Sequence, residues 1–473
     1  MSASGRQNWA GRSGNALVIH PDLRRGGASQ RRTPEACLDE AVGLVAAIDL
    51  SIADALVIGL PKVRPATLFG QGRIDELAAR VAAEEIEVVI VDGHLSPVQQ
   101  RNLERALSCK VIDRTGLILE IFADRARTRE GRLQVELAQL TYQRSRLVRS
   151  WTHLERQRGG LGTVGGPGET QIEADRRMID ERVVLLRRQL DDVIRTRSLH
   201  RQNRASVPYP IVALVGYTNA GKSTLFNRLT DAAVFAHDQL FATLDPTMRI
   251  LVLPSGRRVI LSDTVGFISD LPTHLIAAFR ATLEEVQDAD LLLHVRDICH
   301  PDSAVQRLDV LDVLQTLDVD IEHEDSAIEV LNKIDLLDSE AATKIRRQGD
   351  QQAGLVAVSA QTGDGVEQLL LAIDAWFDQQ ATVCAVVVPA RDGATLAWLH
   401  RYGRVIEQEV VEGDIRLTVR LEQADVGRLR KRLGDGAVLS EAPAAPRERL
   451  GAPRPDRTTG QAVGDVDGAA VAS

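Results

Sequence analysis

Residues 216–223 have the types and spacing that could bind a phosphate chain. They read G-x-x-x-x-G-K-S, follow an apolar run at 211–215, and precede a helical pattern that begins at Thr224. In a P-loop, backbone N–H groups and a helix N-terminus attract phosphate oxygens. Lys222 would reach the β- and γ-phosphates, and Ser223 would ligate Mg²⁺. The predicted nucleotide contacts here are Gly216, Tyr217, Thr218, Asn219, Ala220, Gly221, Lys222 and Ser223.

A second motif identifies the base. N-K-x-D stands at 332–335, after the apolar segment 327–330. Guanine presents two donors that one carboxylate can accept, whereas adenine presents an acceptor at the equivalent ring nitrogen, so Asp335 favours guanine. We expect Asn332 at the other edge of the base, and Lys333 over its plane or bridging to the phosphate loop. Together with the P-loop, this motif predicts GTP rather than ATP.

Three further segments fall in the order that a GTPase needs. D-x-x-G at 263–266 follows a strand pattern; Asp263 would hold the Mg²⁺ shell, and the Gly266 N–H would meet the γ-phosphate. Residues 241–247 fit switch I, in which one threonine completes the Mg²⁺ coordination. S-A-x at 359–361 ends another strand, and its backbone can touch the guanine oxygen. The further predicted contacts are Phe241, Ala242, Thr243, Leu244, Asp245, Asp263, Thr264, Val265, Gly266, Asn332, Lys333, Ile334, Asp335, Ser359, Ala360 and Gln361.

Two residues bear on the rate of hydrolysis. Phe267 stands where many GTPases carry a glutamine that orients the attacking water. A phenyl ring cannot do so, which predicts slow intrinsic hydrolysis; alternatively, Phe267 only packs and another residue orients the water. Asn219 stands where potassium-activated GTPases carry an asparagine. It could help to bind K⁺ beside the phosphates, or it could only stabilise the turn.

Composition limits the class of protein. The chain has 473 residues, too many for one core, and a formal net charge of −9, which argues against a basic nucleic-acid coat protein. Its four cysteines show no C-x-x-C spacing, so neither a zinc site nor a disulfide framework is indicated. No segment has the apolar length of a signal peptide or a membrane span. These features predict a cytoplasmic protein with no integral membrane segment.

Changes in pattern along the chain indicate its domains. Residues 1–35 are polar and rich in Arg and Gly, which predicts disorder, as does the Pro/Ala/Gly/Arg-rich tail at 441–473. The remaining boundaries are 36–124 for a small α/β subdomain, 125–204 for a basic helical hairpin with a Gly-rich tip, 207–378 for the G domain, and 383–440 for a small C-terminal α/β domain.

The predicted hairpin carries a charge opposite to that of the whole chain. Residues 121–204 contain 18 Arg and 11 Asp or Glu, a net formal charge of roughly +7. The arginine fork suits phosphate because it can make two parallel hydrogen bonds. The pattern favours contact with RNA, although a solvated helix face with i,i+4 ion pairs would have the same composition.

Several long blocks outside the G motifs resemble the HflX family of ribosome-associated GTPases. They are RPATLFGQG from Arg64, LSPVQQRNLE from Leu95, VIDRTGLILEIFADRARTREGRLQVELAQLTY from Val111, and GGLGTVGGPGETQIEADRR from Gly159. The resemblance covers roughly residues 40–375. It differs at 164–166, where Val-Gly-Gly stands in a place that often holds an arginine in the family.

The resemblance implies a P-loop GTPase domain preceded by an α/β domain with a helical hairpin and followed by a small α/β domain. It implies a monomer that binds GTP, GDP, the large ribosomal subunit and ribosomal RNA, and not DNA. It also implies dissociation or rescue of stalled ribosomes under stress, with slow hydrolysis that the ribosome stimulates. The alternative is a GTP-dependent RNA-binding switch acting away from the ribosome. The implied catalytic residues are Lys222, Thr243 and Gly266, and the Mg²⁺ ligands are Ser223, Thr243 and Asp263.

Overall fold

In the computed structural model the chain forms two compact units, residues 1–374 and 375–473. The boundary between them falls in the sequence of helix α12 (Val366–Gln380). The residues that the structure describes are 14–23, 31–157, 167–204, 209–230, 240–241, 243–269, 280–319, 326–411, 413–421, 423–433 and 438–442.

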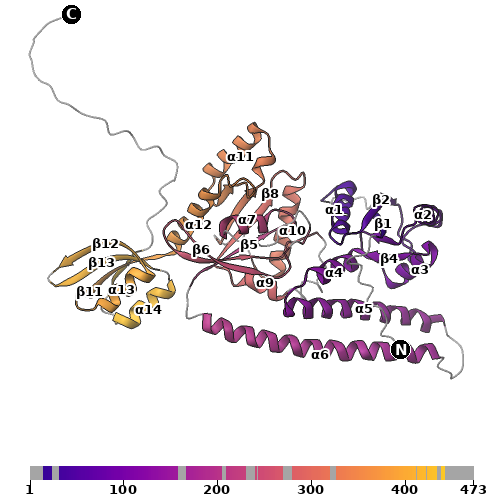
Figure 1. Cartoon of the computed structure of the whole chain (residues 1–473), viewed down its shortest axis with the longest axis horizontal. Helices are drawn as coiled ribbons and strands as arrows, with labels where there is room; N and C mark the ends of the chain where they lie inside the picture. Colours follow the sequence, from indigo (N-terminus) through magenta and orange to yellow (C-terminus); the bar gives the residue numbers. More distant parts are fainter. Residues whose placement is uncertain are drawn as a thin grey trace, which may run out of the picture. The chain divides into compact units, whose positions relative to one another are not determined.

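The first unit begins with a four-stranded parallel sheet in the order β2-β1-β3-β4 (Figure 1). Alternate residues of β1 enter different cores: Val18 packs with α1 and α4 on one face, and Leu17 packs with α2 and α3 on the other. The elements are β1 (Asn15–Leu23), α1 (Pro34–Ala46), β2 (Ser51–Leu60), α2 (Gln71–Ala83), β3 (Val88–Val91), α3 (Pro97–Leu107), β4 (Lys110–Asp113) and α4 (Arg114–Arg125).

The expectation that residues 1–35 lack structure is wrong for β1. This strand lies inside the sheet, where it pairs with both β2 and β3. Residues 16–19 are fully buried because a parallel sheet covered on both faces needs a continuous apolar strand. The Arg- and Gly-rich residues on either side of this run obscured it in the composition. It is also wrong for Pro34 and Glu35, which begin α1, and the predicted disordered tail at 441–473 is wrong for 441–442, which lie in the strand β14 (Val438–Ala442). Residues 1–13 and 24–30 lie outside the described residues, as does the tail from 443 onward.

Two long helices, α5 (Arg129–Gln157) and α6 (Pro167–Arg204), form the predicted hairpin. Figure 1 shows them side by side, and their ion pairs show that they run antiparallel: Glu136 pairs with Arg182, whereas the later Arg144 pairs with the earlier Asp180. Val183, Leu186 and Leu190 are buried along α6. The segment 158–166, which contains nearly all of the predicted Gly-rich tip, lies outside the described residues.

The G domain contains a six-stranded sheet in the order β10-β9-β8-β5-β7-β6. Its strands are parallel except β6, which forms an antiparallel hairpin with β7 across a turn at Gly256. The elements are β5 (Ile211–Gly216), α7 (Lys222–Thr230), β6 (Thr247–Val252), β7 (Arg258–Asp263), α9 (Arg280–Gln287), β8 (Leu291–Asp297), α10 (Ser303–Thr316), β9 (Ala327–Asn332), η1 (Ile334–Leu336), α11 (Ser339–Gln351), β10 (Leu355–Ala357) and α12.

The second unit contains a four-stranded antiparallel sheet in the order β12-β13-β11-β14. Its chain order is βαββαβ, and both helices contribute to a single core that includes Leu399 and Leu429. The helices are α13 (Gly393–Tyr402) and α14 (Gln423–Leu433), and the strands are β11 (Thr382–Pro389), β12 (Arg404–Val411), β13 (Asp414–Leu421) and β14 (Val438–Ala442). The α/β fold class with three such regions is confirmed.

Candidate functional site

A cavity of about 420 Å³ lies where the predicted motifs converge. It is at the carboxyl ends of β5, β7 and β9, the edge at which open parallel sheets bind ligands. Residues from all five predicted motifs line it, together with Thr224 and Leu336, which were not predicted. The lining residues are Thr218, Asn219, Gly221, Lys222, Ser223, Thr224, Phe241, Thr243, Thr264, Gly266, Asn332, Lys333, Asp335, Leu336, Ala360 and Gln361.

The phosphate loop joins β5 to α7 through a backbone that few residue types can adopt. Gly221 has φ 92°, and a Cβ added to it would lie 2.2 Å from Nδ2 of Asn332, so this position requires glycine. Asn219 has φ 58°, in the left-handed region that asparagine tolerates better than most residues. The glycine spacing of the motif therefore has a direct steric cause.

Lys222 is buried at the start of α7 and directs its ammonium group back across the loop. Nζ donates to the backbone carbonyls of Tyr217, at 2.8 Å, and Gly216, at 3.1 Å. Burial lowers the pKa of Lys222 to about 8, although the Asp263 carboxylate opposes this shift. The loop thus holds a cation in a poorly solvated place, where an anionic ligand would interact with it strongly.

Three oxygen-bearing side chains meet at the end of β7. Asp263 Oδ2 accepts hydrogen bonds from Ser223 Oγ at 2.7 Å and from Thr243 Oγ1 at 2.9 Å, and the two hydroxyl oxygens are 2.7 Å apart. Asp263 is fully buried, its Oδ1 has no hydrogen-bond partner, and burial raises the pKa of its carboxyl group. A carboxylate oxygen without a hydrogen-bond partner, beside two hydroxyls, suits a hard cation such as Mg²⁺, which usually takes few ligands from the protein and keeps several waters.

The base end of the cavity carries the predicted carboxylate and two supporting contacts. Asp335 accepts a 2.5 Å hydrogen bond from the Ser359 hydroxyl, which fixes the carboxylate on η1. Lys333, whose φ is 68°, forms a 2.7 Å ion pair with Asp297 at the end of β8. Asp297 was not predicted, because nothing in its local sequence indicates a partner 36 residues later.

Asn332 lines the cavity and also supports two of its loops. Its side-chain Nδ2 donates to the carbonyl of Ala220 at 2.8 Å, and its Oδ1 accepts from the N–H of Ala360 at 3.0 Å. The buried amide therefore joins the phosphate loop to the loop after β10, and its expected contact with the base stays a prediction. Arg228 on α7, also not predicted, supports the same loop by donating to the carbonyls of Ala360 and Gln361.

Some predicted contact residues direct their side chains away from the cavity. Leu244, Val265 and Ile334 are buried in apolar surroundings, and Asp245 contacts the start of α5. Ala242 lies outside the described residues. Phe267 is 1% exposed, and its backbone forms a parallel bridge with Tyr217, so its ring packs in the core. This placement agrees with the alternative that Phe267 is a packing residue.

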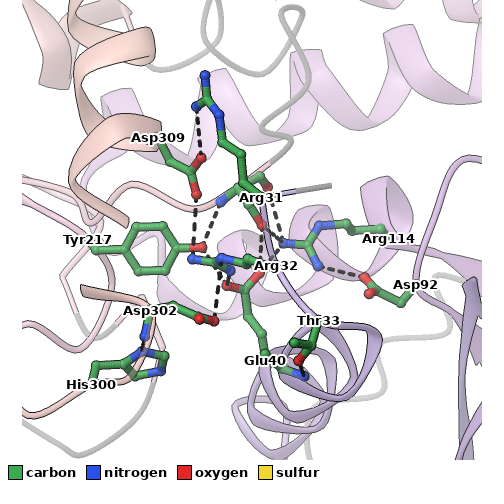
Figure 2. A network of polar contacts seen from close by, with 12 residues as sticks. Arg31, Arg32, Thr33, Glu40, Asp92, Arg114, Tyr217, His300, Asp302 and Asp309 are labelled. Carbon is green, nitrogen blue, oxygen red and sulfur yellow. Dashed lines mark hydrogen bonds and ion pairs between the residues drawn. The ribbon is translucent and has the colours of Figure 1, made fainter. Parts of the chain in front are cut away.

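Tyr217 links the phosphate loop to the N-terminal domain. Its hydroxyl donates to Glu40 of α1 and accepts from the Ser269 N–H at 2.9 Å, just after D-x-x-G (Figure 2). The guanidinium of Arg32 lies 5.0 Å from the centre of the Tyr217 ring. Arg114 of α4 pairs with both Glu40 and Asp92, and also donates to the Ser269 carbonyl at 3.1 Å. This buried network connects the N-terminal domain to the phosphate loop and to residues 263–269, which begin with D-x-x-G and are called switch II.

Comparison with known families gives four matches in consecutive parts of the chain. They are GTP-binding GTPase N-terminal at 35–123, GTP-binding GTPase Middle Region at 125–204, 50S ribosome-binding GTPase at 211–333, and HflX C-terminal domain at 320–442. The GTPase HflX of Magnetococcus marinus is 53% identical over 400 residues, which cover 84% of this chain and 91% of that protein. The GTPase HflX of Escherichia coli is 44% identical over 396 residues, covering 83% and 92%.

Among solved structures, a GTP-binding protein from Sulfolobus solfataricus in complex with GDP is 21% identical, with a TM-score of 0.41 over 76% of this chain and 98% of that chain. The fold, the phosphate loop and the guanine motif define a P-loop GTPase that binds and hydrolyses GTP. The extent of the sequence matches identifies the family as well: the chain belongs to the HflX family of GTPases. No helix in the described ranges is long and apolar enough to cross a membrane.

Proposed function

We propose that this protein is a monomeric cytoplasmic GTPase that binds ribosomal RNA of the large ribosomal subunit and promotes dissociation or rescue of stalled ribosomes. The observation that carries the proposal is the arginine-rich hairpin of α5 and α6, which belongs to the N-terminal domain that contacts the switches. Support also comes from the 50S ribosome-binding GTPase match over the phosphate loop and the guanine motif. The family membership and the exposed charge of the hairpin point in the same direction.

The cavity residues have distinct roles in this proposal. Asp335 and the loop at 359–361 select guanine, while Lys222 and the backbone N–H groups of the phosphate loop bind the phosphates. Gly266 places its N–H at the γ-phosphate. The side chains of Ser223, Thr243 and Asp263 would hold Mg²⁺, which neutralises charge on the phosphates when it is bound. Asn219 is available for K⁺, although its left-handed backbone suits a plain turn residue equally well.

The hairpin supplies the surface for RNA. Arg177, Arg187 and Arg188 are exposed on α6, close to the exposed apolar residues Met178 and Leu185. Planar guanidinium groups bind phosphate oxygens in pairs, and nearby apolar side chains can lie against unstacked bases. Exposed acids on the same helix, such as Glu181 and Asp191, reduce the net charge. We therefore expect binding through selected arginines and not through general charge attraction.

Co-sedimentation tests this proposal directly. The protein should sediment with large ribosomal subunits in a non-hydrolysable GTP analogue and much less in GDP. The double variant Arg187→Glu plus Arg188→Glu should weaken binding by about tenfold or more, because it removes two phosphate contacts and adds repulsion. A matched control with the same change in charge is Lys344→Glu plus Arg347→Glu on exposed α11 of the G domain.

The outcomes separate the two candidate functions. Equal loss of binding in the hairpin and control variants would mean that net charge, and not the hairpin, attracts the protein. No nucleotide-dependent sedimentation, combined with retained binding to isolated RNA, would favour a GTP-dependent RNA switch that acts away from the ribosome. Splitting of stalled ribosomes into subunits by the wild type, with GTP present, would support the rescue function itself.

A further inference from the structure

Switch I contacts the N-terminal domain at two points, Phe241 and Asp245. Phe241 packs edge-to-face against Phe122 of α4, with ring centroids 4.7 Å apart and planes at 77°. Leu244 is buried in the same apolar cluster. Between them, Thr243 lies with its hydroxyl 2.7 Å from that of Ser223. The segment is therefore closed over the cavity, and Thr243 is positioned by the residues on either side of it.

Asp245 makes the second attachment, at the N-terminus of α5. Its Oδ2 accepts from the backbone N–H groups of Arg127, at 2.9 Å, and Thr128, at 2.8 Å, and its Oδ1 accepts from the Thr128 hydroxyl at 2.5 Å. Thr128 is itself the N-cap, since its Oγ1 accepts from the N–H of Gly131 at 2.9 Å. The carboxylate thus lies at the positive end of the 29-residue helix dipole.

Gly131 gives this carboxylate the space that it occupies. A Cβ at position 131 would lie 2.5 Å from Asp245 Oδ1, well inside contact distance. Gly131 is inside the first turn of a helix, where glycine is intrinsically unfavourable compared with alanine. Glycine at position 131 therefore lowers the helical propensity of α5 but leaves room for the Asp245 carboxylate.

We propose that Asp245 is a positioning residue for GTP hydrolysis: by binding Thr128, the N-cap residue of α5, it holds switch I closed so that Thr243 stays beside Ser223 and Asp263. The inference rests on the role of Thr243 in the proposed function. It goes beyond that function because it makes the first turn of the hairpin part of the hydrolytic mechanism. By linkage, a ligand that moves the start of α5 changes the closure of switch I, and the nucleotide state changes the affinity of the hairpin for that ligand.

Three variants test the contact with the protein alone, without ribosomes. Asp245→Ala removes all three acceptor contacts, and Gly131→Ala displaces an intact Asp245 while improving the helical propensity of α5. We expect each to lower kcat for GTP by about five- to tenfold, because Thr243 is then held less precisely beside Ser223, with affinity for GDP unchanged. Asp245→Asn should restore near wild-type kcat, because its amide oxygen can accept from both N–H groups and its NH₂ can donate to Thr128.

The control is an aspartate that caps another helix. Asp338 accepts from the Ala341 N–H at 2.8 Å at the start of α11, away from both switches. Asp338→Ala should lower thermal stability about as much as Asp245→Ala does, yet leave kcat unchanged. A wild-type kcat in Asp245→Ala, or an equal fall of kcat in Asp338→Ala, overturns the inference.

Thr243→Ala shows whether a failure belongs to this inference or to its premise. If Thr243→Ala hydrolyses GTP at the wild-type rate, the proposed role of Thr243 fails and the inference falls with it. If Thr243→Ala is slow but both Asp245→Ala and Gly131→Ala are normal, only the role of Asp245 is wrong. Slow hydrolysis in Thr243→Ala, Asp245→Ala and Gly131→Ala supports the positioning role, provided that Asp245→Asn keeps the wild-type rate.

Discussion

The two ends of the cavity are built in different ways. The base end is supported within the G domain: Ser359 fixes Asp335, Asp297 fixes Lys333, and Asn332 joins two loops. The phosphate end depends on the N-terminal domain, whose α1, α4 and α5 contact the phosphate loop and both switches. We therefore expect recognition of guanine to depend on the G domain alone, and hydrolysis to depend on both domains.

The largest expected effect tests the base end. Asp335→Asn should weaken GTP binding by roughly 10³-fold or more, because an amide cannot accept both guanine donors, and it should strengthen binding of xanthosine triphosphate. Competition titration against a fluorescent nucleotide measures both affinities. Asp338→Asn, on an exposed residue nearby, is the control. Wild-type preference for GTP in Asp335→Asn would show that the base is bound elsewhere.

The next prediction concerns the phosphate end of the cavity and changes Glu40, a residue of the N-terminal domain that contacts the phosphate loop. Glu40→Gln leaves the buried Arg114 and Arg32 without their shared carboxylate, so the free energy of unfolding should fall by about 3–5 kcal/mol. Hydrolysis should also change, while the preference for guanine over adenine should stay. Urea unfolding and nucleotide competition test the two parts. Asp312→Asn, at the exposed Arg31 pair, serves as the control.

The same network predicts a dependence on pH. Burial acts to raise the pKa of Glu40, but Arg114 and Arg32 outweigh it, so that pKa lies below its ordinary value of 4.5. A lowered carboxyl pKa contributes stability above pH 4.5 that is lost as the pH falls through the pKa of the folded state. Glu40→Gln should therefore flatten the loss of stability below about pH 4.5. An acid unfolding curve parallel to that of the wild type would contradict this.

A smaller effect concerns the missing glutamine after D-x-x-G. Phe267 is buried, so Phe267→Gln places an amide in the core and should cost about 3 kcal/mol of stability without accelerating hydrolysis. Single-turnover kinetics with urea unfolding measures both. Leu371→Gln, at a residue of α12 that is 52% exposed and does not line the cavity, shows the effect of a new amide without burial. Faster hydrolysis in Phe267→Gln would mean that this position can orient the water after all.

The smallest effect decides between two roles of Asn219. If its carbonyl binds K⁺, hydrolysis should be severalfold faster in potassium than in sodium at equal ionic strength, and Asn219→Ala should lose the preference. Asn219→Gly is the sharper variant, because it keeps the left-handed backbone and removes only the side chain. Retained potassium preference in Asn219→Gly would assign Asn219 to the turn alone.

Local motifs predicted much of this molecule because their spacing reflects local geometry. The phosphate loop and the long helices α5 and α6 depend on residues close together in the sequence. The converging lining of the cavity followed from the rule that parallel strands end at one edge of a sheet. The positions of the motifs did not predict the direction of each side chain. Asp245 was expected at the nucleotide, but its carboxylate contacts the start of α5.

The contacts that sequence reasoning missed are between residues far apart in the chain. Arg228 supports a loop more than 130 residues later, and Glu40 meets Tyr217 at a separation of 177. No periodicity or motif signals such a pair, because any exposed Arg or Glu has the same local pattern. β1 was missed for another reason: a short strand that is buried on both faces does not alternate, and polar neighbours lowered its average hydropathy.

The position of β1 has a consequence for the order in which the polypeptide acquires structure during synthesis. It precedes both of its partners in the chain, so it is synthesised before β2 and β3, which begin at Ser51 and Val88. Until then, its apolar residues have no sheet to join. A shortened chain that starts at α1 would lack this interior strand, and the ladders of β2 and β3 would lose their shared neighbour. We therefore expect removal of β1 to destabilise the domain that contacts the switches.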